Sequence, residues 1–511
     1  MPVDPTKVAH RGIITVCAMV ATLMQALDST IANVALPYMQ GSLSASYDEI
    51  TWVLTSYIVA AAIMTAPVGW LSARFGQRNL FLVSIIGFTA ASMLCGIATS
   101  LTEMVLFRLT QGIFGAALVP LSQATMLNIY PVERRGSAMA IWGMGVMVGP
   151  ILGPTLGGYL TELYNWRYVF YVNLPFGALA TVGLWMFMPK EDSQPALRFD
   201  WFGFGVLAMG VGALQLMLDR GETKDWFSST EVLTEAVLAV FGIYLFVVHL
   251  FTGERSFVPP RIFRDRNFAA GLVVMFLLGS VLLASSALLA PWLQELGGYP
   301  VEKAGLLMAP RGLGTMAAML IAGRLSNRMD PRLLMAFGVC LLASTLWLMT
   351  GWTPAVSQSE IIWNSVAQGF GMGFVFIPLN VVAFATLAAE LRTQGTALLS
   401  LLRNVGSAIG ISVMETLLVQ NTQIEHSVLA GFATPFNRAF QSSPGVVHMV
   451  SPATPHGAAV LNQMITTQAS VIAYNNDFLL MMGTSLAVLA AIFLMRRPKK
   501  GDGGPAHVAM D

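Results

Sequence analysis

The stretch Leu27-Asp28-Ser29-Thr30-Ile31-Ala32-Asn33-Val34-Ala35-Leu36-Pro37 decides how the rest of the chain is interpreted. It closes an apolar run that begins near Gly12, and it places a carboxylate about sixteen residues into a predicted membrane helix. An ionised aspartate at the centre of such a helix costs roughly 2.5–3.5 kcal/mol on insertion scales. Because leucine would span a membrane better, we interpret Asp28 as a proton or substrate site with a partner elsewhere in the protein. A structural aspartate, bound to a neighbouring helix, is the alternative.

The composition is that of an all-α integral membrane protein. The 511 residues are 55% hydrophobic and only 11% charged, whereas soluble domains carry roughly 25% charged residues. A net charge of +1 provides no basic patch for nucleic acid. Cys17, Cys95 and Cys340 lie far apart in apolar runs, and the six histidines have no metal-binding spacing. There is no phosphate-binding Gly-x4-Gly-Lys-Ser/Thr motif, so we do not expect ATP to drive the protein directly. We expect no enzyme activity and no cofactor, which leaves an ion gradient as the driving force, or none.

Fourteen apolar segments are long enough to cross a bilayer, which needs about 20 residues per helix. They are residues 12–37, 50–72, 79–100, 102–130, 136–163, 168–188, 201–218, 232–251, 268–293, 304–325, 333–350, 361–388, 395–419 and 478–495. With the N-terminus in the cytoplasm, 20 of the 28 Lys and Arg residues fall in cytoplasmic segments and 5 in outer segments. The remaining three are Arg108, Arg311 and Arg403, within helices. This bias predicts a multi-pass protein with both termini cytoplasmic.

The chain repeats itself at an offset of 254 to 259 residues. Residues 69–78 (GWLSARFGQR) match residues 323–332 (GRLSNRMDPR) at Gly, Leu, Ser and both Arg positions. We therefore predict a six-helix half at 1–190, a two-helix insert with its linkers at 191–266, and a second six-helix half at 267–511 with a long periplasmic loop at 420–477. Two parallel halves around a site near the membrane midplane are typical of transporters.

Arg108 is the predicted partner of Asp28. Asp28 lies about 13 Å from the predicted outer end of its helix, at residue 37, and Arg108 about 9 Å from the outer end of its own. An arginine at that depth also needs a partner. The arginine favours the ionised carboxylate and burial favours the neutral acid, so the pair is either a proton-coupling site, which we favour, or a fixed structural pair.

Other polar residues within the membrane are weaker candidates. Glu415 lies about 6 Å from the predicted outer end of its helix, either as a second proton acceptor or as a rim residue, and we favour the rim. The further intramembrane polar residues are Gln111, Arg311, Arg403 and Asn404. No acid stands in the second-half helix that corresponds to residues 12–37, so coupling is expected to depend on the first half unless Glu415 contributes.

Residues 136–163 carry small residues at helical spacing. Gly149, Gly153 and Gly157 recur every four residues and predict a flat face for close packing, and Pro150 and Pro154 are expected to bend the helix. Gly145 and Gly158 belong to the same pattern. The alternatives are ordinary close packing and a wall of a gate or cavity; the corresponding helix of the second half has no proline, which favours the gate.

Each half has one short basic loop after its second predicted helix, at residues 69–78 and 323–332. The first contains Gly69, Arg74, Gly76 and Arg78. Its arginines can bind helix-terminal carbonyls or form a latch between helices, or they only set the topology.

These motifs together resemble the major facilitator superfamily, and within it the fourteen-helix drug:proton antiporters of the EmrB type. The resemblance is carried by residues 27–37 with Thr30, Asn33 and Pro37, by Arg108 with Gln111-Gly112, by residues 143–158 and 165–177, and by residues 214–229. It covers nearly the whole chain. The superfamily usually has an acid where this chain has Ala73 and Asn327, which removes the gating salt bridge attributed to that acid.

The resemblance implies a proton-driven multidrug exporter of the bacterial inner membrane that works by alternating access, with Arg108 serving proton coupling. It also implies lipophilic drug-like substrates, a periplasmic EmrA-like adaptor and a TolC-like outer-membrane channel, with residues 420–477 either a docking surface or a solvated loop. The alternatives are a proton-coupled transporter of a specific metabolite and a non-transporting receptor or scaffold on the same fold.

Overall fold

The chain folds as a bundle of long helices, because only helices satisfy every backbone polar group inside a membrane without a partner strand. The computed structural model describes residues 10–190, 197–253, 256–326, 328–433 and 454–496, and these contain no strand. Thirteen helices are long and apolar enough to cross a membrane. A fourteenth span is the pair α3 (Trp52–Thr65) and α4 (Val68–Phe75), which is bent by 59°. The predicted all-α fold with fourteen spans is thereby confirmed.

The first half contains six spans. They are α1 (Arg11–Ser42), α3 with α4, α5 (Gln77–Ile97), α6 (Leu101–Gly115) with α7 (Leu118–Ile129), α8 (Arg135–Leu163), and α10 (Asn173–Phe187). Short helices α2 (Tyr47–Ile50) and α9 (Tyr168–Tyr171) and the 3-10 turn η2 (Val132–Arg134) connect them. Ser46 closes the first turn of α2 with a capping box to Glu49.

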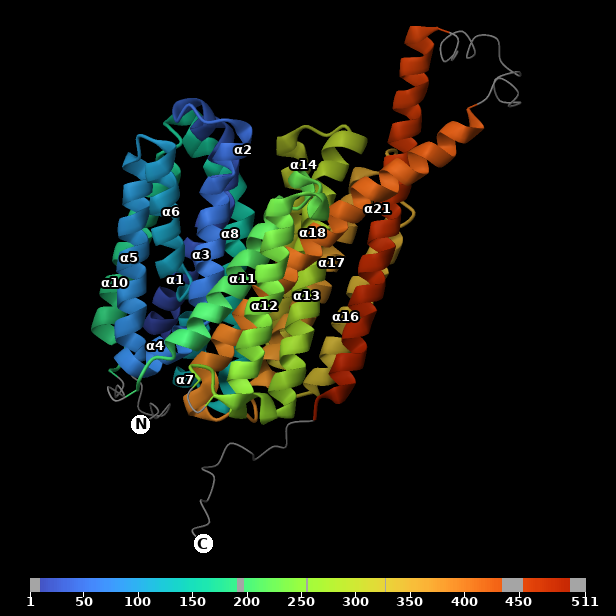
Figure 1. The fold of residues 1–511 in the computed structure, drawn as a ribbon. Helices are drawn as coiled ribbons and strands as arrows, with labels where there is room; N and C mark the ends of the chain where they lie inside the picture. The colour runs from blue at the N-terminus through green and yellow to red at the C-terminus, as the bar shows by residue number, and fades with distance from the viewer. Residues whose placement is uncertain (1–9, 191–196, 254–255, 327, 434–453, 497–511) are drawn as a thin grey trace.

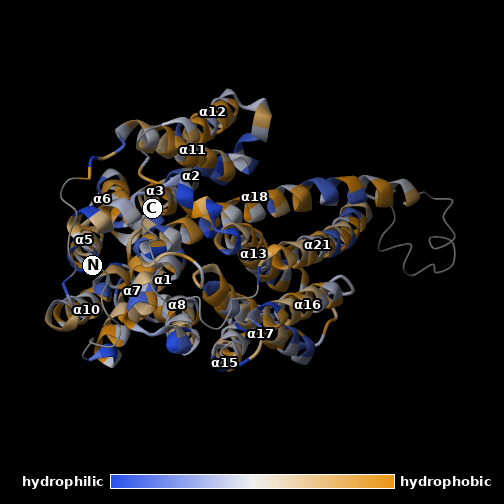
Figure 2. Cartoon of the chain, turned by 90° about the horizontal axis from the view of Figure 1, so that it is seen from below, coloured by the Kyte–Doolittle hydropathy of each residue, from blue (hydrophilic) through white to orange (hydrophobic). Residues whose placement is uncertain are grey.

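Two insert helices lie along the seam between the halves. α11 (Trp201–Arg220) and α12 (Thr230–Thr252) pack through Gly210 and Gly242, where backbones approach closely. Asp200 at the start of α11 lies 2.9 Å from His249 near the end of α12. Viewed along the bundle, α11 lies next to α3 of the first half and also contacts α18 (Arg392–Phe432) of the second (Figure 2). The insert is therefore in contact with both halves.

The second half contains the other six spans. They are α13 (Arg266–Pro291), which continues into the π-turn η6 (Trp292–Leu296), α14 (Val301–Met308) with α15 (Pro310–Leu325), α16 (Pro331–Met349), α17 (Gln358–Ala383), α18, and α21 (Pro455–Leu494). The remaining turns are η3 (Glu222–Lys224), η4 (Trp226–Ser228), η5 (Pro260–Arg264) and η7 (Ala389–Leu391). In Figure 1 the two halves stand side by side, with the described start and end of the chain at the same end of the bundle.

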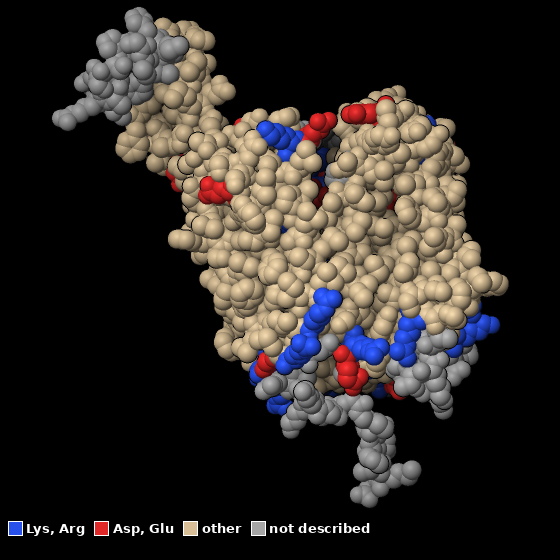
Figure 3. All heavy atoms as spheres, turned by 180° about the vertical axis from the view of Figure 1, so that it is seen from behind, with Lys and Arg blue, Asp and Glu red and all other residues tan. Residues whose placement is uncertain are grey.

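We call this end, which holds Arg11, Arg78, Arg135, Arg332 and Arg496, the basic end. On the face drawn in Figure 3, Lys and Arg side chains gather at the basic end and are sparse elsewhere. A cleft enters the molecule between the two lobes from the opposite end (Figure 3). The molecule is therefore open at the end opposite the basic end.

The end of α1 differs from the sequence prediction. α1 continues through Pro37 to Ser42, so Asp28 lies fourteen residues before the end of the helix and not nine. Pro37 does not stop the helix, although a proline in a helix interior removes one backbone donor. Asp28 is accordingly deeper in the bundle than expected.

The predicted periplasmic loop at 420–477 is wrong for its described parts. α18 extends to Phe432 and α21 begins at Pro455, so residues 420–432 and 455–477 are helical; residues 434–453 lie outside the described part of the chain. We call these two helical extensions the outer arm, and Figure 1 shows them rising beyond the rest of the bundle. Helices continue into water when their polar residues suit a helix, and hydropathy alone does not register this.

Candidate functional site

Asp28 is completely buried and is held by three side-chain donors. Its Oδ2 accepts a hydrogen bond from Arg108 Nη1 at 2.7 Å. Its Oδ1 accepts from Gln111 Nε2 at 2.8 Å and from Asn173 Nδ2 at 3.0 Å. Asp28, Arg108, Gln111 and Asn173 each have 0% exposure. The carboxylate therefore has both oxygens occupied by donors from α6 and α10.

The guanidinium of Arg108 is held by further hydrogen bonds and by two aromatic rings. Its Nε donates to the carbonyl of Val53 at 3.1 Å, and its Nη1 also reaches Gln111 Oε1 at 2.8 Å. The ring of Tyr57 lies 4.3 Å from the guanidinium carbon and that of Phe170 lies 5.7 Å away. Aromatic faces of this kind stabilise a cation that water does not reach. The predicted contact between Asp28 and Arg108 is thus present in the structure.

A second set of polar groups, which the sequence analysis did not predict, supports the pair. Asn173 Nδ2 also donates to Ser92 Oγ at 2.9 Å, and Ser92 in turn donates to the carbonyl of Phe170 at 2.9 Å. Gln25 Nε2 donates to the hydroxyl of Tyr57 at 3.3 Å. Polar residues inside apolar runs, of which Asn173 just before Pro175 is the clearest, were the available signal.

The glycine face of α8 packs against α1 beside Asp28. A Cβ added at Gly149 would lie 2.7 Å from Ala26 Cβ and 2.9 Å from the backbone nitrogen of Leu27, and one at Gly157 would meet Ile31. Gly145 faces Met19 and Gly153 faces Thr30, whereas an added Cβ at Gly158 meets nothing within 4 Å. The predicted close-packing face is therefore present, with α1 as its partner.

For Pro150 and Pro154 of α8, the structure does not test the predicted bend of the helix. α8 is continuous from Arg135 to Leu163, and Pro150 is exposed on its surface. The side chain of Pro154 lies outside the described part of the chain. The bend that both prolines were expected to introduce stays a prediction.

Thr30, Asn33 and Pro37, the residues singled out in the stretch 27–37, lie on two different faces of α1. Thr30 Oγ1 donates to the carbonyls of Ala26 and Leu27 and lies 3.5 Å from that of Gly149 on α8. Asn33 and Pro37 are exposed and take no part in the buried pair. Of the three, Thr30 alone lies at the contact between α1 and α8.

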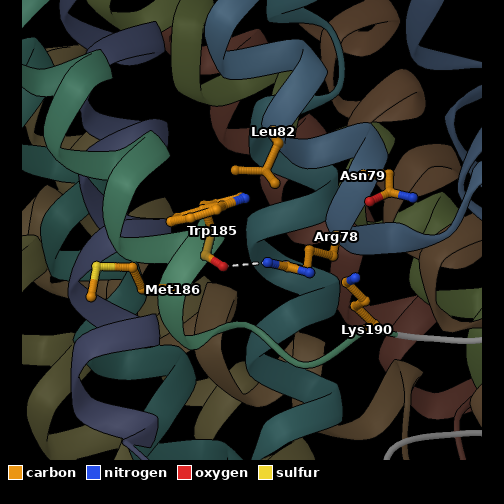
Figure 4. Close-up of a pocket in the computed structure, with 6 residues that line it drawn as sticks. All are labelled: Arg78, Asn79, Leu82, Trp185, Met186 and Lys190. Atoms are coloured by element: carbon orange, nitrogen blue, oxygen red, sulfur yellow. Dashed lines mark hydrogen bonds between the residues drawn. The ribbon is translucent and has the colours of Figure 1, made fainter.

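The first basic loop binds helix ends, as one of the predicted alternatives had it. Arg78 donates a hydrogen bond to the carbonyl of Trp185, in the last turn of α10. Figure 4 shows this bond in a groove of about 530 Å³, lined also by Asn79, Leu82, Met186 and Lys190. In the second half Arg332 Nη1 donates to the carbonyl of Met495, which caps α21, at 3.1 Å. The last arginine of each repeat therefore caps the last helix of its own half.

The rest of the first loop lies at the seam between the halves. Gly76 has φ = 84° where α4 ends and α5 begins, a conformation that glycine adopts without strain. A Cβ at Gly69 would lie 2.7 Å from the Cα of Gln394 on α18. Arg74 is partly buried in the last turn of α4. The loop therefore contacts the opposite half through Gly69.

Neutral contacts close the basic end between the halves. Gln123 on α7 donates to Asn380 on α17, and Thr396 Oγ1 on α18 donates to the carbonyl of Pro120 at 3.0 Å. Trp142 on α8 stacks on Phe376 with ring centroids 6.3 Å apart. Among the described residues no ion pair joins the two halves. This agrees with the absence of the usual acid at Ala73 and Asn327.

The remaining predicted polar residues do not join the Asp28 site. Arg311 donates to Ser286 Oγ at 2.6 Å and Ser285 Oγ at 2.9 Å on α13. Arg403 is partly buried and Asn404 is exposed, both on α18. Glu415 is partly buried on α18, within electrostatic reach of Glu222 and Asp219 near the outer end of the insert. None of these belongs to an ion pair among the described residues.

Comparisons with known proteins agree with this geometry. The Major Facilitator Superfamily model matches residues 18–411. The multidrug export protein EmrB of Escherichia coli (strain K12) is 35% identical, over 98% of this chain and 99% of the relative. The fatty acid resistance protein FarB of Neisseria gonorrhoeae is 32% identical, over 99% of this chain and 100% of the relative. The crystal structure of the human organic anion transporter MFSD10 (TETRAN) has the same fold, with a TM-score of 0.64 at 14% identity, covering 95% of this chain and 100% of that one. The buried acid in helix 1, the two repeated halves and these matches together show that the chain, a multi-pass membrane protein, belongs to the Major Facilitator Superfamily of transporters.

Proposed function

We propose that this chain exports lipophilic and amphipathic drug-like compounds by alternating access, in exchange for protons that bind at Asp28. The observation that carries the proposal is a carboxylate with 0% exposure whose charge is balanced by one equally buried arginine. Relatives that align over nearly the whole chain are named for multidrug export and for resistance to fatty acids. Both names fit apolar or amphipathic cargo.

Protonation of Asp28 changes the contacts of three helices at once. The neutral acid no longer attracts Arg108, so the charge-assisted bond between α1 and α6 weakens to an ordinary hydrogen bond. Gln111 and Asn173 donate to the same carboxylate, and their bonds weaken with it. A proton at this position therefore loosens α1 from α6 and α10.

The packing of α8 carries this change toward the seam between the halves. On one side α8 presents Gly149 and Gly157 to α1, directly beside Asp28. On another side it contacts the second half, where Gly143 meets Met319 of α15 and Trp142 meets Phe376 of α17. A displacement of α1 is thus passed through one rigid helix to the contacts that close the basic end.

The proton gradient supplies enough free energy for useful export. One proton moving down about 100 mV yields roughly 2.3 kcal/mol, and each pH unit adds about 1.4 kcal/mol. Exchange of one proton for one neutral compound therefore sustains a concentration ratio of a few hundredfold. No cofactor is needed for this cycle.

We assign the basic end to the cytoplasm of a bacterial inner membrane, since Lys and Arg favour the cytoplasmic side. The cleft of Figure 3 then opens to the periplasm, and the outer arm extends into it. The arm exposes Ile424, Val428, Phe432 and Met464, and apolar residues at helical spacing suit docking by another helix. We assign this surface to an EmrA-like adaptor that leads to a TolC-like channel.

Transport in proteoliposomes tests the proposal. With an imposed pH gradient, the wild-type protein should accumulate a fluorescent lipophilic cation such as ethidium against its gradient. Asp28→Asn should abolish accumulation, leaving a concentration ratio near one, because Asn keeps the shape of the side chain but does not ionise. Asp225→Asn, at an exposed acid outside the spans, is the matched control and should transport normally. Proton-driven accumulation by Asp28→Asn at the normal rate would refute the coupling role.

A further inference from the structure

The second half contains a buried acid that the sequence prediction overlooked. Asp477 on α21 is 1% exposed. It lies 17 residues before Leu494, where α21 ends at the basic end, which corresponds to about 26 Å along the helix. Since a bilayer core is about 30 Å thick, Asp477 lies within the membrane on the side of the cleft.

Asp477 has none of the donors that hold Asp28. Its Oδ2 is buried without a hydrogen-bond partner. None of the ion pairs in the described part of the chain includes Asp477. An ionised carboxylate placed there would lose its hydration without gaining a counter-charge. Burial without a counter-charge therefore favours the neutral carboxylic acid at this position.

No cation in the described part of the chain offsets the burial of Asp477. Tyr474, one turn earlier on α21, lies within electrostatic reach of Asp477, of Glu295 in η6 and of Glu415 on α18. α21 also packs against α16, whose one charged residue, Arg332, lies at the basic end. For Asp477 itself, burial and not a neighbouring charge disfavours the ionised carboxylate.

The polar atoms near the same end of the second half are incompletely paired. Trp292 and Trp352 are buried with ring centroids 5.3 Å apart, and both indole Nε1 atoms lack an acceptor. Asn475 donates weakly to the carbonyl of Trp352 at 3.5 Å, and its own Oδ1 is buried without a partner. Native proteins rarely leave several buried polar atoms unpaired in one place. Such a place is expected to change its hydrogen bonds when the helices move or water enters.

The backbone at this place is also unusual. α13 ends in the π-turn Trp292–Leu296, directly after Pro291. Single π-turns are rare and are frequently found at functional sites. The turn contains Trp292, whose Nε1 is unpaired, and Glu295, which lies near Tyr474. The irregular backbone and the unpaired atoms therefore belong to one region.

We propose that Asp477 is a second proton-binding residue of the transport cycle. It carries a proton in the arrangement described here, with the cleft open, and releases it to water when the second half rearranges and donors reach the carboxylate. The inference rests on the proposed function and extends it from one proton to two per cycle. A second proton would raise the concentration ratio sustained against a neutral compound from a few hundredfold to about 10⁵-fold.

Infrared difference spectroscopy of the purified protein tests the protonation state without transport. The wild-type protein should show the carbonyl stretching band of a protonated buried carboxylic acid. The band should disappear in Asp477→Asn and persist in Asp225→Asn. Asp477→Glu should shift the band without removing it, which keeps the test decisive if Asp477→Asn does not fold. A band that is unchanged in both Asp477 variants would overturn the proposal.

The number of protons per substrate molecule tests the role in the cycle. In proteoliposomes Asp477→Asn should still transport, with the ratio of protons to substrate lowered by about one and restored in Asp477→Glu. An unchanged ratio in Asp477→Asn, together with loss of coupling in Asp28→Asn, would overturn this inference and leave the proposed function standing. Normal coupling in Asp28→Asn would overturn the proposed function instead, whatever the infrared band of Asp477 shows.

Discussion

The two halves of the molecule treat a buried acid in opposite ways. In the first half Asp28 accepts hydrogen bonds from three side chains, among them a buried arginine. In the second half Asp477 is as fully buried, and its Oδ2 has no partner. One half provides donors and a counter-charge for its carboxylate, and the other leaves Oδ2 of its carboxylate without a donor. The difference teaches that duplication of a fold does not duplicate its electrostatics.

The scaffold, by contrast, is closely repeated. α1 packs on α8 through Gly149, and α13 packs on α18 through Gly406 and Gly410, where added Cβ atoms would meet the backbone of Phe276 and Ser280. Arg78 and Arg332 cap corresponding helices. The repeat therefore preserves backbone contacts, while the polar residues at the centre of each half have diverged.

The largest expected effect is the removal of one partner from the charged pair. Arg108→Gln leaves the Asp28 carboxylate buried without a counter-charge and should destabilise the protein by about 3–5 kcal/mol. Asp477→Asn removes no paired group and should change the stability by about 1 kcal/mol or less. Thermal unfolding in detergent measures both.

Two controls accompany this comparison. The double variant Asp28→Asn/Arg108→Gln should recover much of the loss, because no unpaired charge is left behind. Arg220→Gln, which disrupts the partly exposed pair with Glu231, should cost about 1 kcal/mol or less. Equal losses from Arg108→Gln and Asp477→Asn would contradict the contrast between the halves.

A smaller effect is expected from the glycine faces, where the halves are alike. Gly149→Ala and Gly406→Ala each place a methyl group against the backbone of the facing helix, and each should cost about 1–3 kcal/mol. Gly158→Ala and Gly483→Ala are the controls, since nothing lies within 4 Å of the added atom. Stability in detergent should fall in the first pair alone, and proton-coupled transport should suffer more from Gly149→Ala because that contact lies beside Asp28.

The smallest effect is expected at the two capping arginines. Arg78→Gln and Arg332→Gln each remove a charged donor to the last carbonyls of a helix, worth about 0.5–1 kcal/mol. Hydrogen exchange should increase locally, at the ends of α10 and α21 respectively, and not elsewhere. Arg324 is exposed and lies in the second copy of the repeat, residues 323–332. Arg324→Gln should therefore leave both helix ends unchanged. Faster hydrogen exchange throughout the bundle would argue against local capping.

The fold and the centre of the site could be predicted from the sequence for clear physical reasons. Apolar length determines spans, and the distribution of Lys and Arg indicates their order across the membrane. The contact between Asp28 and Arg108 could be predicted because both charges are costly at similar depth. Gln111 follows Arg108 by three residues, which places both on one face of α6.

Other parts of the site could not be predicted in this way. Asn173 and Ser92 are uncharged, so their presence in an apolar run carries little energetic signal. The sequence analysis places Asp477 at the end of a loop, because the helix that carries it begins 22 residues earlier, at Pro455, outside any apolar segment. Hydropathy marks where a helix meets lipid and not where the helix starts, so an acid at that boundary is easily placed on the wrong side.

The length of α18 has a mechanical consequence. This single helix of 41 residues begins at Arg392 and binds the first half through Thr396 at the closed end. It ends in the outer arm, about 60 Å away along its axis. A tilt of about 10° around the closed end would swing the tip sideways by about 10 Å. Opening and closing of the transporter would therefore move the tip of the outer arm, well beyond the membrane surface, with α18 acting as a lever.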